Sequence, residues 1–302
     1  MKKSLIFSFL LLQSLSFSQE NLNNMSEIHS KILSNRGKEQ FRKSIIFKKL
    51  DRAGYSGSNQ YLEYIGEIEN KYESDNTSFN SKTKGFSMGT NSNLISNPDV
   101  YLGVNLDYLK SKLEYDRENS KVRTYGIDYY VGKNIDNWLI IGRAGYNESK
   151  NIYNNYKYRD KNYSLGVESG YFYSINEKSI LYPYVVFDWN QYTMKAHNNI
   201  KNSNEYIGSS TLGVSYTQEI KEKFLLTMSG EWIYDFANRS DIKLNDTNYR
   251  VKSLDLGRDT GAFNIKLGYF LKPDFLIGIG YSSFLNKNYY YDMFSITLSH
   301  NF

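Results

Sequence analysis

Three histidines are the residues best suited to acid–base or metal chemistry in this chain, which contains no cysteine. His29 lies in the N-terminal segment, His197 in a predicted long connection and His300 near the last residue. A histidine beside an aspartate or serine can activate water or a nucleophile in hydrolases. No flanking pattern of such an enzyme surrounds these histidines, and lone residues discriminate weakly between functions. We therefore predict no enzymatic activity, no metal site and no cofactor.

Two groups of opposite charge offer another kind of chemistry, the pairing of a basic segment with an acidic cavity. The basic group lies in residues 31–52 and includes Arg36, Lys38, Arg42, Lys43, Lys48 and Lys49. The acidic group lies at alternate positions of predicted strands and includes Glu63, Glu67, Asp107, Asp128, Glu168, Asp188 and Glu231. Opposite charges ~4 Å apart attract by ~4 kcal/mol at an effective dielectric of ~20. Whether the two groups meet depends on the elements that carry them.

The apolar residues change their spacing once along the chain. Residues 22–52 have a helical spacing, with Met25, Ile28 and Ile32 followed by Phe41 and Ile45. From about Leu62 to the last residue the spacing is two, in about twelve segments. The last segment alternates most regularly, with Phe294, Ile296, Leu298, His300 and Phe302 on one face and Ser295, Thr297, Ser299 and Asn301 on the other. This period predicts strands with one apolar face.

The predicted connections differ in length between the two ends of the strands. Those after even-numbered segments are short: Lys133–Asn137, Ser174–Ser179, Gln218–Lys223 and Leu271–Asp274. Most of those after odd-numbered segments are longer: Asn147–Lys161, Tyr192–Tyr206 and Phe236–Gly257. Short turns on one side and long loops on the other are typical of bacterial outer-membrane β-barrels. We predict an all-β, antiparallel transmembrane barrel of about 12 strands, with both termini in the periplasm.

The N-terminus has the pattern of a secretory signal. Lys2 and Lys3 precede the apolar run from Leu5 to Leu12, and Ser16-Phe17-Ser18 provides a cleavage site before Gln19. The run is too short to span a bilayer as a helix, which needs ~20 residues. We predict a signal peptide at 1–18, an N-terminal helical segment and linker at 19–60, and the barrel at 61–302. The predicted location is the outer membrane of a Gram-negative bacterium.

Several segments together resemble the autotransporter β-barrel (translocator) domain family over about residues 60–302. The segment 163–173 is similar to a glycine-rich strand of that family, 181–189 to its next strand, and 257–261 to its arginine-containing strand entry. The resemblance implies a helix inside the lumen that tethers an exported passenger. It also implies that Phe294, Ile296, Leu298 and Phe302 form the signal read by the barrel-assembly machinery. Only residues from Gln19 to about Gln60 precede the barrel, so we expect no passenger within this chain.

The charge groups keep two interpretations at this point. In the first, the basic helix plugs an acidic lumen; in the second, it is a solvated, partly frayed periplasmic segment. The resemblance favours a translocator that serves as a membrane anchor or export pore. The alternatives are a porin-like channel and a surface adhesin with Tyr- and Asn-rich loops. The expected partners are the outer-membrane lipid bilayer, the assembly machinery, and a passenger or host surface ligand. With a net charge of +5 and no basic stripe interleaved with aromatics at a helical period, nucleic acid is not expected.

Overall fold

We describe the chain from a computed structural model. It describes residues 2–50, 58–74, 77–115, 118–153, 156–194, 203–236, 242–243, 250–251 and 258–301. The predicted loop residue His197 and the terminal Phe302 lie outside these ranges. Within them, no helix combines the length and the apolar character needed to cross a bilayer.

One long helix precedes a series of strands. The helix is α1 (Lys2–Lys49). The strands before the middle of the chain are β1 (Asn59–Ser74), β2 (Thr77–Leu94), β3 (Asn97–Tyr115), β4 (Glu118–Ile135), β5 (Trp138–Tyr153) and β6 (Tyr156–Tyr171). Those that follow are β7 (Tyr173–Asn176), β8 (Ser179–Met194), β9 (Ser203–Ile220), β10 (Phe224–Asp235), β11 (Ile242–Lys243), β12 (Arg250–Val251), β13 (Asp259–Lys272), β14 (Phe275–Asn286) and β15 (Tyr289–Asn301).

The strands close into a barrel. Each main strand pairs with its sequence neighbours in antiparallel fashion, β6 pairs with β8, and β1 pairs with β15. The short β7 continues the line of β6 beyond Phe172 and pairs with β8. The small hairpin of β11 and β12 forms a separate sheet. Closure leaves the barrel sheet without a free edge among the described strands, as a lipid environment requires. The predicted twelve-stranded antiparallel barrel is therefore confirmed.

The two faces of the barrel wall differ as the period of two predicted. The apolar members of the alternation point outward and are exposed, as at Leu62, Phe187 and Ile296. Their sequence neighbours point inward and are buried or partly buried, and many of them are polar, as at Glu63, Asp188 and Thr297. On β15, Phe294, Ile296 and Leu298 lie outside, while Ser295, Thr297 and Ser299 lie inside. An outer skin of this kind suits contact with hydrocarbon.

The two rims of the barrel have different connections. At one rim, hereafter the short-turn rim, β4 and β5 or β13 and β14 are joined by tight turns. At the other, hereafter the long-connection rim, residues 195–202 link β8 to β9, and 236–258 link β10 to β13. The predicted loop Asn147–Lys161 is wrong, because β5 and β6 continue through it and pair as far as Tyr153 and Tyr156. Long connections mark the extracellular side of such barrels.

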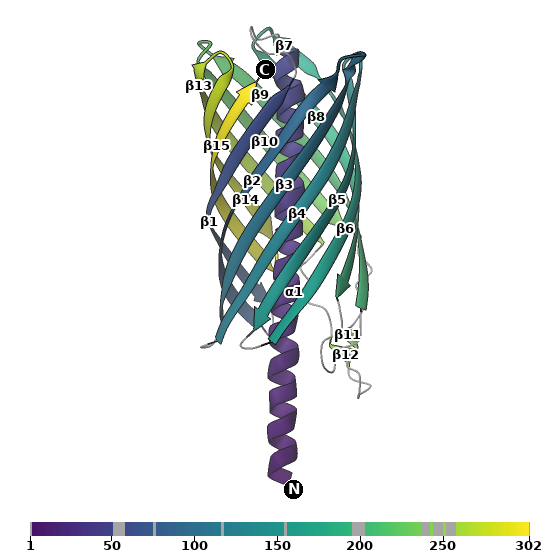
Figure 1. Cartoon of the computed structure of the whole chain (residues 1–302), viewed down its shortest axis with the longest axis vertical. Coiled ribbons are helices and arrows are strands. Elements are labelled where there is room, and N and C mark those ends of the chain that lie inside the picture. Colours follow the sequence, from purple (N-terminus) through teal and green to yellow (C-terminus); the bar gives the residue numbers. More distant parts are fainter. Residues whose placement is uncertain are drawn as a thin grey trace.

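The helix runs through the barrel along its long axis (Figure 1). Its N-terminal end projects well beyond the long-connection rim, the end of the barrel at which β11 and β12 lie, whereas the C-terminal end of the chain lies at the short-turn rim. The prediction of two periplasmic termini is therefore wrong for the N-terminus. An even strand count returns β1 and β15 to one rim, but a helix that crosses the lumen carries its own start to the other. Cleavage after Ser18 stays a prediction.

Candidate functional site: the helix-filled lumen

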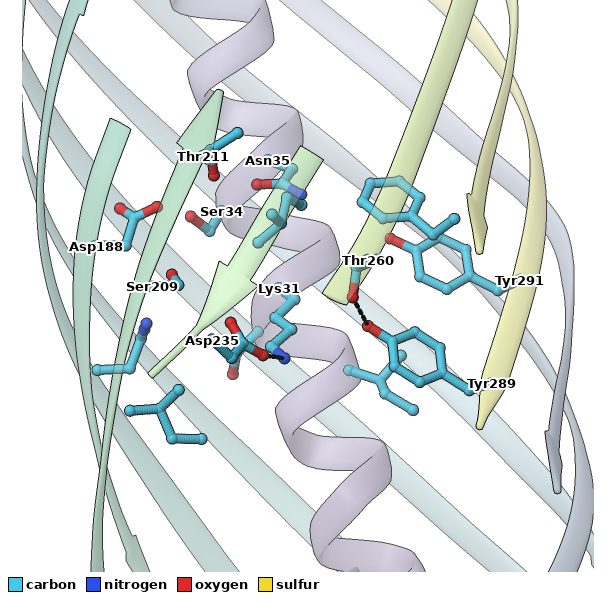
Figure 2. Close-up of a pocket in the computed structure, with 16 residues that line it drawn as sticks. Lys31, Ser34, Asn35, Asp188, Ser209, Thr211, Asp235, Thr260, Tyr289 and Tyr291 are labelled. Carbon is cyan, nitrogen blue, oxygen red and sulfur yellow. Dashed lines mark hydrogen bonds and ion pairs between the residues drawn. The ribbon is translucent and has the colours of Figure 1, made fainter. Parts of the chain in front are cut away.

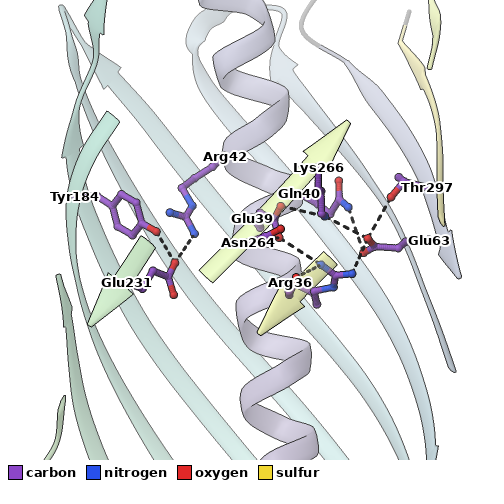
Figure 3. Close-up of polar contacts among 11 residues, drawn as sticks. Arg36, Glu39, Gln40, Arg42, Glu63, Tyr184, Glu231, Asn264, Lys266 and Thr297 are labelled. Atoms are coloured by element: carbon purple, nitrogen blue, oxygen red, sulfur yellow. Dashed lines mark hydrogen bonds and ion pairs between the residues drawn. The ribbon is translucent and has the colours of Figure 1, made fainter. Parts of the chain in front are cut away.

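The centre of the lumen holds a four-membered charge cluster shared by α1 and the wall (Figure 3). Arg36 Nη2 lies 2.9 Å from Glu63 Oε1, and Lys266 Nζ lies 3.2 Å from the same oxygen. Glu39 of the helix lies 3.0 Å from Lys266 and 3.5 Å from Arg36. Two cations and two carboxylates therefore neutralise one another in a buried setting. Such a group is stable only while every member keeps its partner.

Neutral donors complete the coordination of the two carboxylates in this cluster. Glu63 accepts hydrogen bonds from Gln40 Nε2 at 3.2 Å and from Thr297 Oγ1 at 3.1 Å. Asn264 Nδ2 donates to Glu39 at 2.6 Å. The Glu63 side chain is fully buried, with 0% exposed. Its hydrogen bonds thus link α1 to β1, β13 and β15 at one level of the barrel.

A second cluster lies around Arg42, toward the short-turn rim. Its guanidinium is 3.4 Å from Glu231 and 3.5 Å from Glu168, and it stacks 4.1 Å from the centre of the Tyr184 ring. The hydroxyl of Tyr184 donates to Glu231. A buried guanidinium held by two carboxylates and an aromatic face has both charge and shape complementarity. This arrangement fixes the rotation of α1 relative to β6, β8 and β10.

A third cluster links α1 to β4, β5 and β8. Lys38 Nζ lies 2.7 Å from Asp188, which also receives Arg143 Nη2 at 3.0 Å. Arg143 donates in turn to Asp128 at 3.0 Å. The predicted acidic side chains Asp128 and Asp188 thus face a cation of the wall as well as one of the helix.

The half of α1 nearer the long-connection rim also makes polar contacts with the wall. Lys31 lies 2.7 Å from Asp235. His29, fully buried, contacts Thr124 Oγ1 at 2.7 Å and Ser111 Oγ at 2.5 Å. These contacts give His29 a structural place between helix and wall. Among the described side chains, no group of three His, Asp or Glu residues could hold a metal ion.

Apolar side chains also join the helix to the wall, which the sequence pattern did not predict. Near the long-connection rim, Ile28, Ile32 and Leu33 pack with inward residues such as Leu109 and Val122. Near the other rim, Phe41 stacks on Tyr130 with ring centres 5.2 Å apart. The alternation of polar and apolar residues hid these positions, because Leu109 and Val122 fall on the predicted polar face. The lumen is therefore partly apolar, and α1 buries a hydrophobic surface in it.

A glycine lets the helix approach one side of the wall. A Cβ at Gly37 would overlap the Tyr130 hydroxyl and lie 3.3 Å from Asn105 Nδ2. On the wall itself, Gly126 and Gly132 leave room for Leu33 and Phe41. The contacts of α1 are accordingly closest with β2 to β6. Gly37, which weakens the helical pattern in the sequence, is thus explained by packing.

Cavities lie on the opposite side of the helix. One lies between α1 and strands β8 to β10 and β13 to β15 (Figure 2). Small polar residues, including Ser34 of the helix with Ser209 and Thr211 of β9, line it together with apolar side chains such as Ile233 and Phe284. Another lies beside Arg36, Glu39 and Arg42. The long charged side chains cross this wider side, where the backbones lie farther apart.

The other residues predicted for the site have varied positions. Lys43 is buried, with its ammonium 5.4 Å from the centre of the Phe47 ring. Lys48 and Lys49 leave the lumen and donate to the carbonyls of Pro98 and Asp136 at the short-turn rim, each at 2.8 Å. Asp107 points inward but accepts its hydrogen bond from Asn105 of its own strand, at 2.6 Å. The Glu67 side chain lies outside the described part of the chain.

This geometry can be compared with known proteins. The family model described as Autotransporter beta-domain matches residues 63–282. The chain belongs to the autotransporter β-domain family. Among curated proteins, no relative matches this chain in sequence. As an autotransporter barrel it lies in the outer membrane, where its exposed apolar band meets lipid.

Solved autotransporter structures share the fold of this autotransporter barrel. The translocator domain of NalP from Neisseria meningitidis is 12% identical over 92% of this chain and 98% of its own, with a TM-score of 0.67. The transport unit of AIDA-I from Escherichia coli is 11% identical over 83% and 92%, with a TM-score of 0.61. The β domain of the Bordetella autotransporter BrkA is 12% identical over 81% and 99%, with a TM-score of 0.58. At these identities the likeness extends to the fold alone.

Proposed function

We propose that this autotransporter barrel works as a membrane anchor in which α1 stays in the lumen, both as a tether and as a plug. The start of α1 then lies outside the cell, and anything attached there would be held at the surface. The fit of α1 to the wall carries the proposal, since the helix places Lys31, Arg36, Lys38 and Arg42 against carboxylates from several strands. The proposal assigns no catalytic step to the barrel.

The direction of α1 can be tested by surface display. A short epitope tag inserted after Glu20 should bind antibody on intact cells, because α1 begins at the long-connection rim. The matched control is the same tag after Ile95, which is fully exposed in the β2–β3 turn at the short-turn rim. That tag should bind antibody only after the outer membrane is permeabilised. Detection of the Glu20 tag only in permeabilised cells would contradict the proposed direction.

The plug can be tested by electrical conductance. Deletion of residues 20–55 should open the lumen and raise the single-channel conductance of the purified barrel in a planar bilayer. A synthetic peptide of residues 22–50 should lower the conductance again, because its charges and apolar face match the wall. If the conductance does not rise on deletion, the proposal that α1 plugs the lumen is wrong. A full-length chain that already conducts steadily would favour the porin-like channel instead.

We also propose that the last strand carries the signal for the barrel-assembly machinery. Phe294, Ile296 and Leu298 support this, since they form an outward apolar row on β15, the strand that closes the barrel against β1. The variant Phe302→Gly should lower the amount of protein in the outer membrane, while refolding of the purified chain into detergent is unchanged. The control Ser299→Ala alters an inward side chain and should behave as wild type. An unchanged amount of Phe302→Gly in cells would oppose the proposal.

A further inference from the structure

The outer wall of β2 to β6 carries a band of basic side chains just beyond a set of aromatic residues. Each of these strands contributes one outward aromatic residue to this set, namely Phe86, Tyr108, Tyr125, Tyr146 and Tyr163. The next two outward positions toward the long-connection rim are, strand by strand, Lys84 and Lys82, Lys110 and Lys112, Arg123 and Lys121, Glu148 and Lys150, and Lys161 and Arg159. Nine of these ten residues are basic, and we call them with Glu148 the basic band.

The aromatic residues mark the depth at which the wall leaves the hydrocarbon. The Tyr108 ring lies 5.5 Å from that of Phe86 and 5.1 Å from that of Tyr125, and the Tyr146 and Tyr163 rings lie 5.2 Å apart. Tyrosine is enriched where barrels cross the membrane–water interface, because its ring has an apolar body and a polar tip. The basic band therefore begins at the level of the lipid head groups. Since it lies toward the long-connection rim, these are the head groups of the outer leaflet.

Two members of the band sit directly on this aromatic row. Lys150 Nζ lies 5.1 Å from the centre of the Tyr125 ring, and Lys161 Nζ lies 6.0 Å from that of Tyr146. Cations held over ring faces keep their charge near the interface rather than extending into water. The positive charge and the aromatic row thus form one continuous surface.

The strand register places like charges directly opposite each other in the band. Lys84 pairs with Lys110, Lys110 with Arg123, and Arg123 with Lys150. Lys150 pairs in turn with Arg159. Like charges opposite each other destabilise a sheet. One of these cations, Arg159, forms an ion pair with Glu148 at 3.1 Å. Lys84, Lys110, Arg123 and Lys150 have no carboxylate partner among the described residues, and such a row of cations calls for anions from outside.

The other half of the barrel provides an internal comparison. The corresponding outward positions on β8, β9, β13, β14 and β15 are Gln191 and Thr193, Ser210 and Gly208, Gly261 and Asp259, Ser283 and Leu285, and Asp292 and Tyr290. None of these ten is basic and two are acidic. Both halves meet the same bilayer, so a general attraction to its surface would not concentrate the charge on one side. The one-sided band indicates a bound molecule of definite size.

We propose that the basic band binds a phosphorylated glycolipid of the outer leaflet. Its phosphate groups would lie against Lys84, Lys110, Arg123 and Lys150, while its acyl chains pack on the outward apolar wall below the aromatic row. Leu106, which lies two residues before Tyr108, is exposed there. Charge complementarity and continuity with the lipid-facing wall favour a lipid over a soluble polyanion, which has no acyl chains to fill that surface. This site is independent of α1 and of the proposed plug.

Binding to purified full-length protein in neutral detergent tests the proposal. The probe is bisphosphorylated lipid A, and the readout is the bound fraction by native mass spectrometry. The variant Lys84→Gln/Lys110→Gln/Arg123→Gln/Lys150→Gln should bind at least tenfold more weakly than wild type. The matched control, Lys133→Gln/Lys178→Gln/Lys223→Gln/Lys272→Gln, removes the same charge at the short-turn rim and should bind as wild type. Enzymatically dephosphorylated lipid A should bind both quadruple variants and wild type alike.

Other outcomes would overturn the proposal. Equal loss of binding in both quadruple variants would indicate that binding depends on the net charge of the protein and not on this site. Displacement of lipid A by millimolar inorganic pyrophosphate would indicate a site for small anions, and stronger binding of heparin or duplex DNA than of lipid A would indicate a soluble polyanion. A second measurement covers a folding defect in the variant. Added lipid A should raise the midpoint temperature of thermal unfolding more in wild type than in the double variant Lys84→Gln/Lys110→Gln. An equal rise in the two proteins would contradict the site.

Discussion

The buried carboxylate of Glu63 is where a single substitution should release the helix. In Glu63→Gln the amide keeps the shape of the side chain but loses its charge. Arg36 and Lys266, which lie 2.9 and 3.2 Å from Glu63, then share only Glu39 as a carboxylate partner. Removing one member of a buried ion pair costs ~3–5 kcal/mol because it leaves a buried charge without compensation. We take the lower value, ~3 kcal/mol, since Glu39 remains.

This free-energy cost should shift the equilibrium between barrels with α1 inside the lumen and barrels with α1 outside it. Each 1.4 kcal/mol is about tenfold in an equilibrium constant, so the fraction of barrels with an empty lumen should rise ~100-fold. Once α1 leaves, water solvates both cations, and the barrel wall itself stays closed by its strand pairing. The assay is single-channel recording in planar bilayers at low salt, where openings of Glu63→Gln should be far more frequent than those of wild type.

The matched control is Asp107→Asn, which removes a buried inward carboxylate that is hydrogen-bonded by Asn105 of its own strand. It should leave the opening frequency close to that of wild type. Traces of Glu63→Gln that match wild type, in protein with the heat-modifiable gel mobility of a folded barrel, would refute the reasoning. Equal opening of both variants would also refute it, because any loss of lumen charge would then suffice.

Three further predictions concern the packing of helix and wall. Gly37→Val should raise the opening frequency because its side chain collides with the Tyr130 hydroxyl, and Tyr130→Ala in the same chain should lower that frequency again. Phe41→Ala should weaken docking of the 22–50 peptide to the helix-deleted barrel by ~3 kcal/mol or more, the usual cost of removing a buried phenylalanine, as measured by titration. Ile296→Arg should lower the free energy of unfolding in lipid vesicles by ~2–4 kcal/mol if it lies near the bilayer midplane, and no change would place it outside the hydrocarbon.

The closed barrel could be predicted from the sequence because a membrane wall imposes a period of two on nearly every strand. The outward row of β15 was readable residue by residue. The strands beyond the hydrocarbon were harder, as at the false loop Asn147–Lys161. There Lys150 and Arg159 point outward and Asn151 and Asp160 point inward, so both faces are polar and the alternation of hydrophobicity disappears.

The residues of the lumen could be predicted by charge but not by partner. The rotation of the helix and the register of the strands together determine that Arg36 pairs with Glu63, while Asp107 contacts no cation of the central cluster. Neither the rotation nor the register can be derived from the spacing of residues in the sequence. The stacking of Phe41 on Tyr130 was missed for a related reason. An aromatic residue at an inward position of a strand looks the same in sequence whether it faces water or a helix. Gly37, which lies opposite Tyr130, was a signal of close approach, but a glycine at that position is read more easily as a weakness of the helix.

The direct test of a helix within the lumen is a photocrosslink from α1 to the wall. A diazirine analogue of leucine at position 33 lies against β4, where a Cβ at Gly126 would be 3.3 Å from the Leu33 Cδ1 atom. Irradiation of intact outer membranes followed by peptide mass spectrometry should place the adduct on β4 of the same chain. The same analogue at Leu298, on the lipid face, should yield adducts with lipid. Adducts of position 33 with lipid, with water alone or with another protein would contradict a lumen filled by its own helix.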